Sequence, residues 1–358
     1  MNYNFWKDKK VFVTGHTGFK GSWLSLWLQQ CGSEVSGYSL DPPTKPSLFE
    51  LADVASGMNS NIADIRNYEE LQTAILKFDP EIIFHMAAQP LVRLSYEEPL
   101  ETYSTNVMGT ANLLNAARGC TNLKSILVIT TDKCYQNNEW YWGYRETDRL
   151  GGYDPYSNSK ACCELVVSSF RDSFFNERKY DEHGVAIASV RAGNVIGGGD
   201  WAADRIIPDA IKSFLKDENL LVRSPGAIRP WQHVLEPLRG YLTLAQELFE
   251  NGIEKAGAYN FGPDESDAKP VSWIMDQLCD VWQGGASWYT ESFEQPHETN
   301  YLKLDCSKSK TELGWLPTWN LDRALLEISN WYKSYRNNED MRHVTLKQIE
   351  SYQSESGC

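Results

Sequence analysis

The sequence predicts an α/β fold in which a doubly wound parallel sheet is followed by a smaller C-terminal α/β lobe. Short apolar segments typical of buried strands alternate with segments long enough for crossover helices. A glycine-rich turn joins the first of these strands to the first helix. At 358 residues the chain also exceeds a typical single domain, which favours two lobes.

The apolar segments locate the strands in chain order. The first, residues 9–15, ends at a glycine, and residues 22–30 follow it with apolar side chains at helical spacing. Further strands are expected at residues 34–40, 81–86 and 125–130, and residues 259–262 are expected to return to the sheet. Because the segments between these strands are long enough for crossover helices, the sheet should be parallel.

The segment 15–21 reads Gly-His-Thr-Gly-Phe-Lys-Gly, with its three glycines spaced three residues apart between strand and helix. Absent Cβ atoms permit a tight turn and let backbone N–H groups approach a pyrophosphate at the helix N-terminus. The pattern predicts a Rossmann-type dinucleotide site, with a plain glycine-rich turn as the alternative. The expected cofactor-binding residues of this loop are Gly15, His16, Thr17, Gly18, Phe19, Lys20 and Gly21.

Two acidic positions follow later strands of the same region. Asp41 lies 20 residues after Gly21, where a carboxylate can bind the adenosine ribose and repel a 2′-phosphate. This favours NAD over NADP, although an aspartate before proline is also ordinary turn chemistry. Asp64 and Ile65 follow a further short strand and could contact the adenine edge, with a helix N-cap as the alternative.

Tyr156 and Lys160 open a long helical segment. Residues four apart share one helix face, so the Lys160 ammonium can lie near the Tyr156 phenol. That charge, with help from an oxidised nicotinamide, would lower the phenol pKa from about 10 toward neutrality. The resulting phenolate could remove a proton from a sugar hydroxyl as hydride leaves its carbon. A helix with a surface tyrosine and lysine is the alternative.

These segments together resemble the extended short-chain dehydrogenase/reductase family, and the resemblance covers most of the chain. The matching segments are residues 14–21, 85–89, 104–110, 130–133, 156–160 and 191–197. The resemblance implies that Ala87, Ala88 and Asn106 lie along the cofactor cleft. It also implies that Thr131 polarises the substrate hydroxyl beside Tyr156.

Asp132 and Lys133 indicate the reaction within that family. Epimerases of the family usually have small residues at these positions, and nucleotide-sugar 4,6-dehydratases usually have Asp-Glu. The Asp-Lys pair, with residues 85–96, 191–201 and 229–234, resembles dehydratases that act on CDP-glucose. The resemblance implies Asp132 as the acid for the C6 hydroxyl and Lys133 as the base at C5, or else as an electrostatic stabiliser of the enolate. A strand-end ion pair is the alternative.

The implied reaction is the NAD-dependent conversion of CDP-D-glucose to CDP-4-keto-6-deoxy-D-glucose, a step of deoxyhexose biosynthesis for surface polysaccharides such as the O-antigen of lipopolysaccharide. No short motif specifies cytosine, so the dTDP, UDP and GDP sugars remain alternatives. A nucleotide-sugar 4-epimerase would share every motif except the Asp132-Lys133 pair. A non-catalytic NAD-sensing or scaffold protein would tolerate loss of Tyr156 or Lys160. The presence of both residues therefore disfavours this class.

The strand-helix alternation loosens near residue 190, where turn residues begin to cluster. We expect an NAD-binding domain at residues 1–190 with a return segment at 233–262, and a nucleotide-sugar lobe at 191–232 and 263–358. Arg205, Arg229 and His297 are the cations assigned to the diphosphate. Hydrogen bonds to the substrate are expected from Gln89, Asn194 and Asn260.

Composition limits the remaining possibilities. A net charge of −14 disfavours binding to nucleic acid or to an anionic membrane surface. The eight cysteines show no zinc-ligand spacing, so we expect no metal site and reduced thiols in a cytoplasmic protein. The N-terminus enters a strand directly, and no apolar run approaches the length of a membrane span.

Two helices, expected at residues 107–118 and 159–174, carry more apolar residues than one buried face requires. In the resembled family such a pair from each subunit forms a four-helix interface. The resemblance therefore implies a homodimer, with a tetramer also possible.

Overall fold

The computed structural model describes residues 2–291 and 301–357. A seven-stranded sheet with the order β10-β6-β5-β4-β1-β2-β3 forms its centre, and every neighbouring pair in it is parallel. Its strands are β1 (Lys10–Thr14), β2 (Glu34–Ser39), β3 (Asn59–Ile62), β4 (Ile82–His85), β5 (Ser125–Ile129), β6 (Ala186–Ala192) and β10 (Gly257–Phe261). The predicted doubly wound parallel sheet is confirmed.

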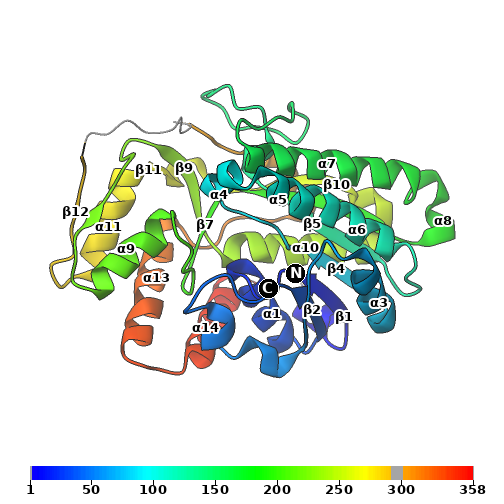
Figure 1. Ribbon diagram of the computed structural model, residues 1–358, viewed down its shortest axis with the longest axis horizontal. Coiled ribbons are helices and arrows are strands. Elements are labelled where there is room, and N and C mark those ends of the chain that lie inside the picture. Colours follow the sequence, from blue (N-terminus) through cyan, green and yellow to red (C-terminus); the bar gives the residue numbers. More distant parts are fainter. Residues whose placement is uncertain (1, 292–300, 358) are drawn as a thin grey trace.

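Alternate side chains of each central strand enter two separate hydrophobic layers. On β1, Val11 and Val13 belong to the layer shared with α1 and α10, whereas Phe12 belongs to the layer under α3, α6 and α7. Both layers are buried, which explains why residues 11–13 of β1 and 126–129 of β5 are continuously apolar rather than alternating. Figure 1 shows α5, α6 and α7 above the sheet and α1 and α10 below it.

The helices around this sheet follow the chain in the expected crossover pattern. They are α1 (Phe19–Gln30), α2 (Leu48–Leu51), α3 (Tyr68–Phe78), α4 (Val92–Glu97), α5 (Pro99–Tyr103), α6 (Gly109–Ala117), α7 (Pro155–Ser173), α8 (Tyr180–His183), α10 (Leu235–Asn251) and α12 (Ser307–Leu313). Short 3-10 turns are η1 (Tyr3–Trp6), η2 (Val54–Gly57), η4 (Asp132–Cys134), η5 (Glu177–Lys179), η6 (Gly252–Lys255) and η7 (Glu265–Asp267), and η3 (Ser104–Met108) is a π-helix.

Two smaller sheets and three further helices lie beside the end of the main sheet. One small sheet has the order β11-β9-β7 and the other pairs β12 with β8. Their elements are β7 (Asn194–Ile196), β8 (Leu220–Leu221), β9 (Ile228–His233), β11 (Ala268–Pro270), β12 (Trp288–Tyr289), α9 (Ile206–Leu215), α11 (Val271–Trp282) and α13 (Leu321–Arg336). The final helix α14 (Met341–Glu355) packs against both α13 and α1.

Helix boundaries differ from the sequence expectation where capping decides them. The first helix begins at Phe19, inside the glycine motif, because Gly18 is its N-cap. Helix α7 begins at Pro155, and the Asp154 carboxylate accepts a hydrogen bond from the Ser157 amide at its start.

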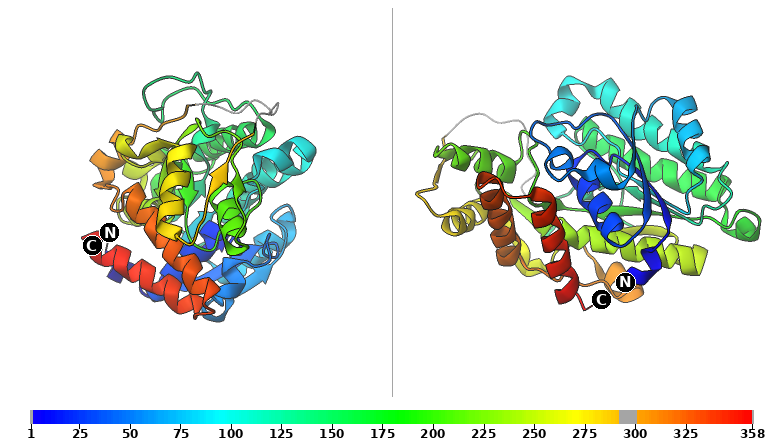
Figure 2. Two further views of the ribbon diagram at one scale, coloured as in Figure 1. Left: turned by 90° about the vertical axis from the view of Figure 1, so that its left-hand side faces the viewer. Right: turned by 90° about the horizontal axis from the view of Figure 1, so that it is seen from below.

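The two described chain ends lie side by side in both views of Figure 2. Among the described residues, no helix is long and apolar enough to cross a membrane.

Candidate active site

The glycine loop between β1 and α1 is shaped by contacts that exclude side chains. Gly15 has φ +77°, and a Cβ there would lie 2.7 Å from the Ala87 nitrogen. A Cβ on Gly21 would lie 2.0 Å from the Gly15 carbonyl oxygen. Gly18 caps a helix whose first N–H groups lack intrahelical acceptors. This narrow loop at a helix N-terminus suits a pyrophosphate, so the residues present fit a dinucleotide.

The loop lies at the switch point of the sheet, where the strand order reverses between β1 and β4. His16 is buried against β2 and its Nε2 lies 2.7 Å from the Ser60 hydroxyl. The Thr17 hydroxyl donates to the Leu40 carbonyl oxygen at 2.8 Å, which fixes the end of β2 beside the loop. Burial lowers the pKa of His16 to about 4, so its ring is neutral at physiological pH.

The two acidic positions lie in different surroundings. Asp41 is exposed just beyond the carboxyl end of β2. Asp64 receives hydrogen bonds from the Arg66 side chain, which lower its carboxyl pKa. The N-cap of α3 is Asn67, so Asp64 does not cap that helix. Ile65 is buried beside Asp64 and packs under Gly109.

The turn that follows β5 carries the acid and base candidates. Thr131 and Asp132 are buried, and the Thr131 hydroxyl donates to the Asp132 Oδ1 at 3.0 Å. Burial raises the pKa of Asp132, against the opposing charges of Lys133 and Arg229. A carboxyl group in this state is a competent proton donor. Lys133 is half-buried in the same turn, η4.

Tyr156 and Lys160 project from the first turns of α7 beside this turn, and both are buried. The Lys160 Nζ donates to the Ile129 carbonyl oxygen at 3.0 Å, at the end of β5. Without the nicotinamide that the expectation includes, the pKa of Tyr156 is raised, because burial outweighs the Thr131 hydrogen bond and the Arg205 charge. Burial also lowers the pKa of Lys160. The protein groups alone therefore leave the phenol protonated.

Two further cations lie within electrostatic range of these groups. Burial and the charges of Lys160 and Arg205 lower the pKa of Lys20 to about 7, while Asp132 opposes the shift. Arg205 is the N-cap residue of α9, and its Nη1 donates to the Asp200 carboxylate at 3.0 Å. Lys20 of the glycine loop, Asp132 of the turn after β5 and Arg205 at the start of α9 therefore lie within electrostatic range of one another.

A family model described as GDP-mannose 4,6-dehydratase matches residues 12–328. The chain belongs to this family. Over 354 residues it is 56% identical to a CDP-glucose 4,6-dehydratase of Salmonella typhimurium, with 99% of both chains covered. A dTDP-glucose 4,6-dehydratase of Shigella flexneri is 24% identical, covering 92% of this chain and 94% of the relative.

Solved structures show the same fold. A dTDP-glucose 4,6-dehydratase of Bacillus anthracis in complex with NAD superposes with a TM-score of 0.73 at 20% identity, covering 93% of this chain and 99% of that one. A UDP-N-acetylglucosamine 4-epimerase of Methanobrevibacter ruminantium reaches a TM-score of 0.77 at 22% identity, covering 92% and 99%. Both reaction types therefore occur on this architecture.

Among the family positions predicted from the sequence, three amides are engaged within the protein. Asn106 donates to the Gln89 carbonyl oxygen and to the Ser159 hydroxyl. The Gln89 amide donates to Leu91 and Thr102.

Asn260 is the third of these amides. It is fully buried, and its side chain donates to the carbonyl oxygens of Tyr144 and Asp305 and accepts from the Tyr135 hydroxyl. Both hydrogens of each of these three amides are therefore donated within the protein, and the expected ligand-binding roles of Asn106, Gln89 and Asn260 stay predictions.

The remaining predicted positions lie around the same edge of the sheet. Ala87 and Ala88 follow β4 next to Gly15, and Asn194 begins β7 just after β6. Arg229 is buried on β9, and its charge acts on Asp132. His297 lies outside the described residues.

Sequence reasoning missed the partners that hold the site. Asp200 is buried, fixes Arg205 and accepts a hydrogen bond from the Tyr332 hydroxyl at its carbonyl oxygen. Tyr332 lies on α13, so no local pattern links it to this loop. Glu164 is different, because its position four residues after Lys160 places it on the same helix face.

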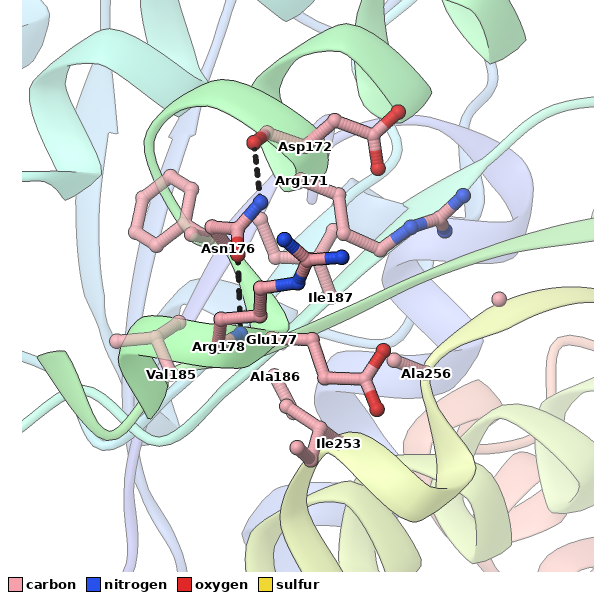
Figure 3. Close-up of a pocket in the computed structure, with 12 residues that line it drawn as sticks. Arg171, Asp172, Asn176, Glu177, Arg178, Val185, Ala186, Ile187, Ile253 and Ala256 are labelled. Atoms are coloured by element: carbon pink, nitrogen blue, oxygen red, sulfur yellow. Dashed lines mark hydrogen bonds between the residues drawn. The ribbon is translucent and has the colours of Figure 1, made fainter. Parts of the chain in front are cut away.

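A separate pocket of about 280 Å³ opens at the amino ends of β6 and β10. Figure 3 shows Asn176 there, donating to the Asp172 carbonyl oxygen and accepting from the Arg178 amide. The glycine loop and the turn after β5 lie at the carboxyl ends of the strands, which is the opposite edge of the sheet. This pocket is therefore not part of the candidate active site.

Proposed function

We propose that this protein catalyses the NAD-dependent 4,6-dehydration of CDP-D-glucose to CDP-4-keto-6-deoxy-D-glucose. The observation that carries the proposal is the turn Thr131-Asp132-Lys133, whose first two residues are buried, beside Tyr156 and Lys160. The cytidine nucleotide is supported by the 56% identity to a CDP-glucose 4,6-dehydratase. The product would serve deoxyhexose and surface-polysaccharide synthesis in the cytoplasm, and the seven cysteines that the structure describes are free thiols.

The cofactor would be held by the glycine loop of residues 15–21, with Asp41 at the ribose and Ile65 at the adenine. Ala87 and Ala88 would line the cleft where β4 ends. When bound, NAD would supply an acceptor for the hydride that leaves C4 and returns to C6 after elimination, and a positive charge beside Tyr156. The exposed Asp41 carboxylate would repel a 2′-phosphate, which supports NAD over NADP.

Oxidation at C4 needs a base for the C4 hydroxyl proton. Tyr156 would take that proton, with the Thr131 hydroxyl hydrogen-bonded beside it. Its raised pKa makes this residue depend on nearby positive charge to ionise. Arg205 and Lys160 are the protein cations available for this role, and Lys160 also fixes the end of β5 through Ile129.

Elimination needs an acid at the C6 hydroxyl and proton removal at C5. Asp132 would supply the acid, because its burial raises the pKa of the carboxyl group and keeps a proton available. Lys133 would remove the C5 proton or stabilise the enolate by its charge. Its half-buried position next to the Asp132 carboxyl group is compatible with both roles.

We assign residues 191–232 and 263–358 to the nucleotide-sugar lobe and residues 1–190 and 233–262 to the cofactor domain. The assignment is supported by α10, which packs on β5 and β6, and by β10, which extends the main sheet. Arg205, Arg229 and Asn194 are the described residues proposed to bind the substrate diphosphate, and His297 remains a sequence-based candidate.

We further propose a homodimer built on α5 to α7. This region carries exposed apolar side chains at Leu100, Met108 and Leu165, with exposures of 83%, 55% and 59%. Such a surface is unusual on a monomer. Replacing Leu165 by Glu should convert the dimer to a monomer in light-scattering measurements, whereas Leu326→Glu, on α13, should not.

The proposed activity is tested by incubating the purified protein with NAD and the CDP, dTDP, UDP and GDP forms of glucose. We expect a 4-keto-6-deoxy sugar, detected by its absorbance in alkali, with CDP-glucose as the preferred substrate. A 4-epimer without that absorbance would support the epimerase alternative. Preference for another nucleotide would contradict the cytidine assignment but retain the reaction.

A further inference from the structure

A buried ion pair outside the proposed catalytic groups joins α7 to β6. The Arg191 Nη2 lies 2.8 Å from the Glu164 Oε2, and the two side chains are only 4% and 3% exposed. These charges are fully removed from solvent, so the pair gains little net stability over an apolar replacement. The role of the pair follows from the groups to which its two side chains are hydrogen-bonded.

The Glu164 end of the pair holds the start of the catalytic turn. The carboxylate accepts hydrogen bonds from the hydroxyls of Ser189 and Thr130. Thr130 immediately precedes Thr131, and its amide is also bonded to the Val190 carbonyl oxygen at 2.8 Å. The start of the turn is therefore fixed to both α7 and β6.

The Arg191 end of the pair holds the C-terminal end of the same turn. Its Nη1 donates to the Tyr135 hydroxyl at 2.8 Å and to the Glu146 carbonyl oxygen at 3.1 Å. The guanidinium lies 4.9 Å from the centre of the Tyr135 ring. Tyr135 is the C-cap of η4, and its hydroxyl donates onward to Asn260 at 2.8 Å.

We propose that Glu164 and Arg191 are positioning residues that clamp both ends of residues 131–134. The pair sets where Thr131 faces Tyr156 and where Asp132 and Lys133 face the sugar. This inference rests on the proposed dehydratase function and adds two residues to it. Errors of about 1 Å in such a constellation can lower rates by about 100-fold, so a rigid clamp has a direct catalytic consequence.

The clamp is tested by removing its contacts without leaving a buried charge unpaired. Thr130→Val and Tyr135→Phe each delete one hydroxyl from the clamp. The double variant Glu164→Gln with Arg191→Met removes both charges together. Tyr259→Phe is the matched control, because it deletes a buried hydroxyl that bonds Glu312 at 2.7 Å, away from the turn.

We expect kcat to fall by about 10- to 100-fold in the three clamp variants, with KM unchanged. Thr130→Val should slow oxidation at C4, whereas Tyr135→Phe should slow elimination, so reduced nicotinamide should build up only in the second. Tyr259→Phe should lose thermal stability alone.

Clamp variants that lose stability but keep wild-type kcat would overturn the inference. If the double variant does not fold, the two hydroxyl variants decide. A wild-type protein that forms no 4-keto sugar would instead refute the proposed function.

Discussion

At the residue scale, Asp132 is the most specific test of the elimination chemistry. Its buried carboxyl group has a raised pKa, and an amide in its place cannot donate the required proton. Asp132→Asn should therefore retain oxidation at C4 and exchange of the C5 hydrogen with deuterated solvent. Loss of water from C6 should fall by about 100-fold or more, measured by formation of the 4-keto-6-deoxy product.

Lys133→Met is the companion variant for that measurement. If Lys133 removes the C5 proton, deuterium exchange at C5 should stop in this variant while oxidation continues. Slow residual exchange would assign the lysine to enolate stabilisation. Wild-type elimination in Asp132→Asn would remove Asp132 as the acid.

The sequence pointed to candidate reacting groups more readily than to the groups that hold them in place. Tyr156, Lys160 and Asp132 are predictable because local spacing and a strand end bring them to one edge of the sheet. The internal hydrogen bonds of Asn106 and Asn260 were not predictable, because their partners come from segments distant in the chain. No local pattern reports which buried amides have already donated both hydrogens.

At the element scale, the turn from β1 to α1 leaves no room for a side chain at Gly21. A Cβ there would lie 2.0 Å from the Gly15 carbonyl oxygen, so α1 would have to move. Gly21→Ala should lower the free energy of unfolding by about 1–3 kcal/mol, as overpacking of a tight contact does. Denaturant unfolding measures this change.

Gly18→Ala is the control for the same loop. Its Cβ would have its nearest contact at 3.4 Å, and its φ of −77° suits any residue. Its stability should therefore stay close to that of the wild type. Equal destabilisation by both substitutions would show that the close contact at Gly21 is not what constrains the turn.

The strands β4 and β5 were predictable because burial on both faces leaves a continuous apolar run, as residues 126–129 of β5 show. The helix of residues 107–118 was less predictable. Over these residues the structure has the end of the π-helix η3 followed by α6, and η3 lies where Asn106 bonds Gln89 and Ser159. Hydrogen bonds to other segments, rather than helical periodicity, determine this interruption.

At the scale of the whole molecule, three buried histidines make the fold sensitive to acid. Burial lowers the pKa of His16 to about 4 and those of His85 and His233 to about 3. Since the unfolded chain takes up these protons near pH 6.5, the stability they provide is present above that pH. It is lost as the pH falls toward their folded values, by about 1.4 kcal/mol per pH unit for each histidine.

His233→Phe isolates one of these three contributions. His233 packs its ring against Trp23 and Trp319, and its Nε2 has no hydrogen-bond partner among the described residues. A phenyl ring can occupy this site without taking up a proton, and comparison with the wild type cancels the carboxyl groups that titrate in both proteins. Denaturant unfolding between pH 6 and 4 should therefore show a slope shallower by about 1.4 kcal/mol per pH unit in the variant. Equal slopes in the two proteins would mean that the pKa of His233 is the same in the folded and unfolded states.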